Sequence, residues 1–318
     1  MSPQPLEEAR RTGFRSPPPR KGHTPLADVH THIARKQVDE LIDAARLYGV
    51  EKIFSIAPLD DALRLRDRYP GLIEPVTNLA FDHRQDPAQF AEENRALLAR
   101  AVTGGVRVVK LWLSPRASDR FDGLQLDSPL LDPIFEGLAQ HRLRLLLHVA
   151  DPDLWFEKKY TDVAKYGTKG DQYVRLEQRL TRFPTVRVLV AHMGGHPEDL
   201  AHLGRLLDRY RNLSLDTGAT RWMVRELGRQ PEAARAFFAQ YADRLLFGTD
   251  QVVLDEPDAE RYAVRYWIHQ MFWETDLVCE LPIDDPDADG VPMLRGLDLP
   301  AEVLKKVYWD NAIRWLAA

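Results

Sequence analysis

Five residues of this sequence could bind a metal ion and do chemistry with it. They share one feature, a position at the carboxyl end of an apolar run, and they are His30, His32, His148, His192 and Asp250. His30 and His32 are two residues apart, so a β-strand would point both imidazoles to the same face. Imidazole and carboxylate are ligands that zinc, manganese, iron(II) and cobalt accept. We therefore expect a divalent metal, with zinc as the first choice.

A His-x-His pair alone could be a buried structural pair, and the other run ends favour the metal interpretation. A metal with an open position lowers the pKa of water toward about 7, which makes a nucleophile available at neutral pH. Asp250 could accept the proton of that water, alone or together with His192. The sequence therefore predicts that Asp250 and His192 are catalytic residues.

Three further residues are candidates for substrate binding. Lys110 and Trp112 lie at the end of another apolar run, and Arg221 follows a later one. Lys110 could bind a substrate carboxylate, or it could be a carboxylated lysine that bridges two metal ions. Arg221 could grip a carboxylate or phosphate, or form a surface salt bridge. Trp112 could form an apolar wall or belong to the core.

The elements that must position these residues alternate between short β-rich runs and longer amphipathic runs. The predicted strands are 26–33, 52–57, 73–79, 106–113, 143–149, 186–192, 213–217 and 245–249, and helical patterns separate them. Eight strands that alternate with helices favour a (β/α)8 TIM barrel over an open doubly wound sheet, which remains the alternative. Active sites of such barrels lie at the carboxyl ends of the strands, where the candidate residues are found.

Two segments fall outside the barrel pattern. Residues 1–25 are rich in Pro, Arg and Gly, so we expect an N-terminal arm that is disordered or strapped across the surface. The barrel domain spans 26–318 and includes a long segment at about 251–298 after strand eight, which we interpret as an inserted cap. The aromatic stretch of that cap could serve as a lid or as a subunit interface of a homo-oligomer.

Composition excludes several classes of protein. The formal net charge is −5 and the pI is about 6.1, so the chain lacks the basic surface that nucleic acid requires. Cys279 is the single cysteine, which rules out an intrachain disulfide and a thiolate zinc cage. No signal peptide and no membrane span are evident, so we expect a cytoplasmic protein that acts on a small molecule.

The motifs taken together resemble those of the amidohydrolase superfamily, in particular its amidohydrolase-related branch, which includes aminocarboxymuconate-semialdehyde decarboxylase and dicarboxylate lactonases. The matching motifs are Asp-Val-His-Thr-His at 28–32, His148 with Ala-Asp-Pro at 150–152, Ala-His-Met-Gly-Gly-His-Pro at 191–197 and Phe-Gly-Thr-Asp at 247–250. The resemblance implies that His30, His32, His148 and Asp250 are the metal ligands. It also implies that His192 orients water or substrate or binds a second metal, and that Lys110 lies where binuclear relatives carry a carboxylated lysine.

Two reactions fit these residues. The first is hydrolysis of a carboxylic ester, lactone or amide by metal-activated water, with His192 stabilising the oxyanion. The alternative is nonoxidative decarboxylation of an unsaturated or aromatic acid, in which the metal orients a carboxylate. A noncatalytic binding protein on the same barrel would be expected to have lost ligands, and all five candidates are present. Segments 155–172 and 251–298 match no relative of known substrate, so the substrate does not follow from the resemblance.

Overall fold

The computed structural model describes residues 4–33, 37–256 and 258–317. Residues 1–3 of the predicted arm therefore lie outside the described residues, as do 34–36, 257 and 318 within the predicted barrel domain. The chain divides into two compact units. Unit 1 comprises Met1–Ser55 and Thr217–Ala318, and unit 2 comprises Ile56–Asp216. Unit 1 is thus built from both ends of the chain, whereas unit 2 is continuous.

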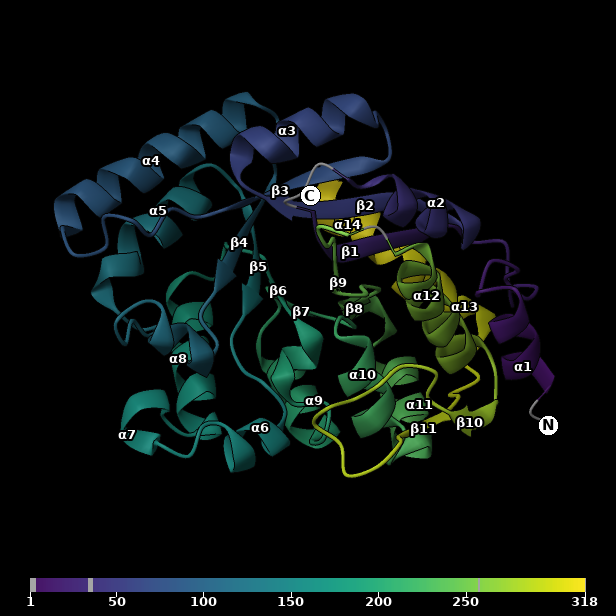
Figure 1. Cartoon of the computed structure of the whole chain (residues 1–318). Helices are drawn as coiled ribbons and strands as arrows, with labels where there is room; N and C mark the ends of the chain where they lie inside the picture. The colour runs from purple at the N-terminus through teal and green to yellow at the C-terminus, as the bar shows by residue number, and fades with distance from the viewer. Residues whose placement is uncertain (1–3, 34–36, 257, 318) are drawn as a thin grey trace. The chain divides into compact units, whose positions relative to one another are not determined.

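The strands predicted from the sequence are all present, in places shorter than expected (Figure 1). They are β1 (Leu26–His32), β2 (Val50–Ala57), β3 (Ile73–Asn78), β4 (Val108–Trp112), β5 (Arg144–His148), β6 (Val188–Val190), β7 (Leu213–Asp216) and β8 (Leu245–Leu246). Within the described residues they form a nine-stranded sheet in the order β8-β7-β6-β5-β4-β3-β2-β1-β9, where β9 is Gln251–Val252. The Val29 N–H also donates to the Phe247 carbonyl at 2.9 Å, which joins the first strand to the end of the eighth. The fold is a (β/α)8 barrel.

Helices fill the intervals between the strands. The main ones are α2 (Asp39–Leu47), α3 (Leu59–Arg68), α4 (Pro87–Thr103), α5 (Asp132–Gln140), α8 (Lys169–Arg182), α9 (Leu200–Arg209), α11 (Pro231–Gln240), α13 (Ala301–Lys305) and α14 (Asn311–Ala317). Their starts carry the expected signals: Asp86 caps α4 ahead of Pro87, and Thr168 forms a capping box with Asp171 at α8. No helix in the described part of the chain is long and apolar enough to cross a membrane.

In unit 1, the segment predicted as a cap contains β9, a long helix and a small hairpin. The helix is α12 (Ala259–Glu274), and the hairpin pairs β10 (Val278–Glu280) with β11 (Met293–Arg295). Residues 266–274 of α12 are all buried, and the helix packs against α2. Because α12 is buried on nearly all sides, it contributes to the internal packing of unit 1.

The N-terminal arm of unit 1 begins with α1 (Gln4–Arg11) and is held against α12. Phe14 is buried, with its ring centroid 5.5 Å from that of Trp267, and its carbonyl accepts a hydrogen bond from the Tyr48 hydroxyl at 2.6 Å. Arg20 forms a salt bridge with Glu274 at 3.1 Å. The described part of the arm, residues 4–25, is thus strapped to the fold.

His269 of α12 illustrates a histidine whose role is structural. Its Nδ1 accepts from the Trp273 indole N–H and its Nε2 lies 3.0 Å from the Thr220 hydroxyl, so both ring nitrogens have partners within unit 1. Burial lowers the pKa of His269 to about 3, with the nearby Arg265 charge adding to the effect. The ring is therefore neutral at physiological pH.

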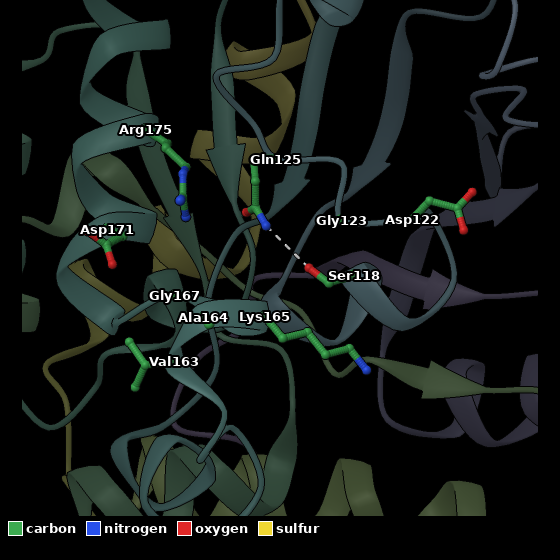
Figure 2. Close-up of a pocket in the computed structure, with 10 residues that line it drawn as sticks. All are labelled: Ser118, Asp122, Gly123, Gln125, Val163, Ala164, Lys165, Gly167, Asp171 and Arg175. Carbon is green, nitrogen blue, oxygen red and sulfur yellow. Dashed lines mark hydrogen bonds between the residues drawn. The ribbon is translucent and has the colours of Figure 1, made fainter.

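In unit 2, strands β4 to β7 pair in parallel and form an apolar core. Leu145, Leu146 and Leu147 of β5 are almost completely buried, as expected of a parallel strand covered on both faces. A pocket of about 560 Å³ lies among the segments 118–125, 163–167 and 171–175 (Figure 2). Its lining contains none of the residues that the sequence predicts for the site.

Candidate metal site

In unit 1, the pairing of β1 with β9 brings three predicted ligands together. Thr31 pairs with Gln251, and the Asp250 N–H donates to the His30 carbonyl at 2.8 Å. Asp250, which directly precedes β9, therefore lies beside the His30-x-His32 pair although 218 residues of sequence separate Asp250 from His32. The side chain of His30 is fully buried, while 35% of the His32 side chain and 26% of the Asp250 side chain are exposed.

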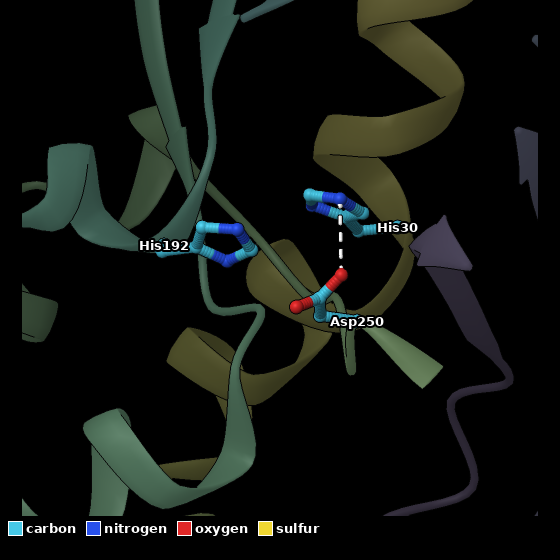
Figure 3. A group of neighbouring side chains, drawn as sticks. All are labelled: His30, His192 and Asp250. Carbon is cyan, nitrogen blue, oxygen red and sulfur yellow. Dashed lines mark ion pairs between the residues drawn. The ribbon is translucent and has the colours of Figure 1, made fainter. Parts of the chain in front are cut away.

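The three side chains direct one ligand atom each to a common point (Figure 3 shows the His30–Asp250 pair). His30 Nε2 and His32 Nε2 are 3.3 Å apart, and they lie 3.3 and 3.2 Å from Asp250 Oδ1. In a tetrahedral site with metal–ligand distances of about 2.0–2.1 Å, neighbouring ligand atoms lie about 3.3–3.4 Å apart. Donor type and spacing thus fit a divalent metal, and His30, His32 and Asp250 would hold it.

A buried carboxylate fixes both chain segments that carry these ligands. Asp28 is fully buried and accepts from the backbone N–H of His30 at 3.2 Å, from the Thr249 N–H at 3.0 Å and hydroxyl at 2.6 Å, and from the Tyr266 hydroxyl at 3.0 Å. Burial raises the pKa of Asp28 to about 6, although these hydrogen bonds oppose the shift. Asp28 thus orients the His30 backbone directly and Asp250 through its neighbour Thr249.

Two predicted catalytic residues have strained backbones. Asp250 has φ 57° and His192 has φ 58°, in the left-handed region that few residues other than glycine adopt. His192 lies two residues after the end of β6, and Asp250 lies in the short segment between β8 and β9. Such strain costs about 1 kcal/mol or more and persists where the surrounding structure imposes it, often at functional sites.

In unit 2, strands β4 and β5 place three predicted residues on one face. Trp112 pairs with His148, and Lys110 pairs with Leu146 two residues earlier. Paired residues of parallel strands share a face, so Lys110, Trp112 and His148 point to the same side. Lys110 is almost completely buried and lies two residues before the strand end, deeper in the sheet than His148. The Trp112 ring packs edge-on against Phe121, with the centroids 5.9 Å apart.

His148 is oriented by an acid that is not among the predicted site residues. Its Nε2 lies 2.9 Å from Oδ1 of the buried Asp151, whose Oδ2 accepts from the Tyr160 hydroxyl at 2.6 Å. Burial opposes ionisation of Asp151, but the interactions with His148 and Tyr160 outweigh it and keep its pKa below the usual range. A carboxylate on one ring nitrogen fixes the ring so that the other can bind a metal. In the sequence, the feature that could have indicated this role is the position of Asp151, three residues after His148.

The loop after β6 carries His192 and lies against the end of β5. The ring centroids of His148 and His192 are 4.6 Å apart, nearly perpendicular, and the His192 N–H donates to Asp216 at 2.8 Å. A Cβ added to Gly195 would lie 2.0 Å from the Ala150 carbonyl oxygen. Only glycine therefore allows this loop to approach the residues that follow His148.

We expect Gly195→Ala to lower the free energy of unfolding by about 3 kcal/mol or more, because the methyl group collides with backbone. Gly71→Ala is the matched control, since Gly71 also has a positive φ (82°) but no atom within 4 Å of the added Cβ. Its backbone strain alone should cost about 1 kcal/mol. Urea unfolding of both variants measures the difference, and equal losses would contradict the close approach.

Arg221 lies in unit 1, as the ligand group does. It lines a pocket of about 530 Å³ whose other charged residues are Arg261, Arg265, Asp258, Glu260 and Asp284. Of these three arginines only Arg221 was predicted to bind substrate, because it follows a predicted strand, whereas Arg261 and Arg265 lie in the segment predicted as a cap. The structure thus brings together His30, His32 and Asp250 in unit 1, and His148 and His192 in unit 2, and it places Arg221 in a pocket lined by both arginines and acids.

Comparison with known proteins points to one family and several reactions. The family model for amidohydrolases matches residues 75–317. A solved structure described as a 2-pyrone-4,6-dicarboxylic acid hydrolase from Pseudomonas putida has a TM-score of 0.58 at 15% identity, covering 93% of this chain and 98% of that one. A search of curated proteins found no match.

Two further solved structures share the fold at similarly low identity. One is a 5-carboxyvanillate decarboxylase from Novosphingobium aromaticivorans in complex with manganese, with a TM-score of 0.53 at 19% identity, covering 87% of this chain and 79% of that one. The other is a 4-oxalomesaconate hydratase from Rhodopseudomonas palustris, with a TM-score of 0.52 at 13% identity, covering 92% and 95%. One fold thus carries hydrolase, decarboxylase and hydratase chemistry, and the reaction must be argued from the residues.

Proposed function

Because this chain belongs to the amidohydrolase family, we propose that it is a metal-dependent hydrolase that cleaves a carboxylic ester, lactone or amide bond of a small molecule. The observation that carries the proposal is the group of His30, His32 and Asp250, whose ligand atoms are separated by the distances expected around a tetrahedral metal. His148, the last residue of β5, is proposed as the fourth ligand, as the resemblance to the amidohydrolases implies.

A divalent metal, with zinc as the first choice and manganese, iron(II) or cobalt as alternatives, would polarise a carbonyl and lower the pKa of water at this site. Asp250, partly exposed and next to both histidines, is proposed to accept the proton of the attacking water and to return it to the leaving group. His192 is proposed to stabilise the negative charge that develops on the carbonyl oxygen. Asp28 and Asp151 act as positioning residues.

Decarboxylation of an unsaturated or aromatic acid is the second candidate. Arg221 is proposed to bind a carboxylate of an acidic substrate, which either reaction could use. In a decarboxylase, Asp250 or His192 would supply the proton that replaces the carboxyl group. Carbon dioxide release from a panel of aromatic and unsaturated acids, compared with acid release from lactones and esters, distinguishes the two candidates.

Metal content per chain tests the shared premise of both candidates. We expect about one zinc per chain in wild type, and the same content in Lys110→Ala if Lys110 is a substrate contact, because Lys110 is then no ligand. A carboxylated, bridging Lys110 would instead give two metals that fall to one. Mass spectrometric metal analysis of protein purified without chelator measures this.

Lys165→Ala is the matched control for that measurement, because Lys165 belongs to unit 2 but is 44% exposed and pairs with Asp119. Its metal content should equal that of wild type. If wild type binds no metal even after reconstitution with zinc or manganese, the proposed function is wrong.

A further inference from the structure

A second group of possible metal ligands lies in unit 2, outside the residues proposed for the first site. Its members are Asp153, His196 and Glu198, which offer one ligand atom each within 4.8 Å of one another. Asp153 begins α6 (Asp153–Lys158), after strand β5, and the two others follow strand β6. The Asp153 N–H donates to Glu198 Oε1 at 2.8 Å, so the two chain segments are in direct contact. One imidazole and two carboxylates form a ligand set that zinc accepts.

The imidazole of His196 is suited to bind a metal. Its side chain is 15% exposed, and within the described residues its buried Nδ1 has no hydrogen-bond partner. Its Nε2 lies 3.8 Å from Asp153 Oδ1, which is too far for a hydrogen bond, so burial of the ring is poorly offset. Burial lowers the pKa of His196 to about 4, and the charge of Lys169 adds to the shift. The ring is therefore neutral at pH 7, which is the form that binds metals.

A lysine ammonium lies among these ligand atoms. Lys169 Nζ donates to Asp153 Oδ1 at 2.6 Å and lies 3.6 Å from Glu198 Oε2, and its side chain is 12% exposed. An ammonium holds carboxylate oxygens at about 2.7–2.9 Å, whereas zinc binds them at about 2.0–2.2 Å. The ligand atoms thus have the wider spacing that an ammonium imposes. Because the Asp153 side chain is 49% exposed, it can move closer to His196 around a smaller cation.

Lys169 can leave this group without disturbing the fold. It is the first residue of α8, and its ammonium is carried on a flexible four-carbon stem that water hydrates strongly once it swings outward. Two carboxylates against one ammonium leave the group with a net negative charge, since His196 is neutral. A divalent ion in place of the ammonium would balance both carboxylates.

We propose that Asp153, His196 and Glu198 form a second binding site for a divalent transition metal such as zinc, which binds in competition with the ammonium of Lys169. This site shares no ligand with the proposed hydrolytic site and does not depend on the proposed function. A metal bound there joins the loop after β5 to the loop after β6. Asp151, which orients His148, and His192 lie in these two loops, so the metal stabilises the arrangement of both.

Zinc titration against a competing chromophoric chelator tests the site on the full-length chain after its metal has been removed. We expect one tightly bound equivalent and a second that binds at least about tenfold more weakly, because Lys169 must be displaced. The weaker equivalent is lost during purification, so only titration reveals it. His196→Asn should weaken the second equivalent at least about tenfold, and Lys169→Met should tighten it about fivefold because the competing ammonium is gone.

His83→Asn is the matched control, because His83 also belongs to unit 2 and lies beside a carboxylate, that of Glu93, but its side chain is 46% exposed. Both zinc affinities should stay within about twofold of wild type. Where His196→Asn does not fold, Asp153→Asn carries the test and should cause the same loss.

Three results would overturn the second site: titration finds no weaker equivalent, His196→Asn leaves that equivalent intact, or Lys169→Met leaves its affinity unchanged. Loss of the weaker equivalent in Lys110→Ala would also overturn it, since the metal would then belong to a carboxylated lysine. Absence of the tight equivalent, with the weaker one retained, removes the proposed function and leaves this site standing.

Discussion

Replacing Asp250 by Asn is expected to reduce turnover by about 10³-fold or more while leaving the fold intact. The amide has nearly the volume of the carboxylate, but it can neither accept a proton nor neutralise a metal ion. Asp250 Oδ1 also lies 3.2–3.3 Å from both histidine nitrogens, so zinc affinity should fall as well. The measurement is kcat on whichever lactone, ester or acid wild type converts fastest, together with zinc content.

Asp276→Asn provides the same chemical change at an exposed position of unit 1 and should behave as wild type. Circular dichroism checks that both variants fold. Near-normal turnover in Asp250→Asn would show that another group handles the proton, and the assignment of Asp250 would have to be abandoned.

Replacing Asp28 by Ala is expected to lower the free energy of unfolding by about 2–4 kcal/mol and zinc affinity about 10–100-fold. The substitution leaves four buried donor groups without their acceptor, on His30, Thr249 and Tyr266. The raised pKa of Asp28 shows that burying its charge is itself costly, and relief of that cost keeps the loss below the sum of four hydrogen bonds. Urea unfolding and competitive zinc titration measure the two effects.

Asp67→Ala removes a carboxylate that is 70% exposed and should change neither quantity appreciably. Asp28→Asn keeps one acceptor oxygen and should fall between wild type and Asp28→Ala. A loss of stability with unchanged zinc affinity would make Asp28 a purely structural residue.

The barrel was predictable because its strands are apolar and its helices are amphipathic, and these periodicities depend on local sequence. The end of strand eight was less predictable. Residues 245–249 were expected to form a strand, but β8 ends at Leu246. Beyond it, the Gly248 N–H bonds to the Thr217 hydroxyl and the Thr249 N–H bonds to Asp28. Side chains distant in sequence replace the sheet partners there, and local sequence does not reveal such exchanges.

The metal candidates are predicted for a related reason: a polar residue at the end of a buried strand is conspicuous. The residues that support these candidates could not be predicted. Asp28 and Asp151 flank the histidines but resemble ordinary loop or strand acids until their hydrogen bonds are known. Arg261 and Arg265 lie one helical turn apart on α12. Because most other residues of α12 are buried, its sequence shows no periodic pattern of apolar and polar residues that would distinguish a pocket-facing side from a core-facing side.

The discontinuity of unit 1 has a consequence for synthesis on the ribosome. Unit 2, residues 56–216, is continuous, so it has been synthesised in full before the segment that begins at Thr217. The first 55 residues must wait for the segment from Thr217 onward, because β1 pairs with β9 and Phe14 packs against Trp267 of α12. During that interval His30 and His32 have been synthesised but have no Asp250 beside them. A nascent chain therefore acquires the complete unit 1 ligand group only in the last third of translation.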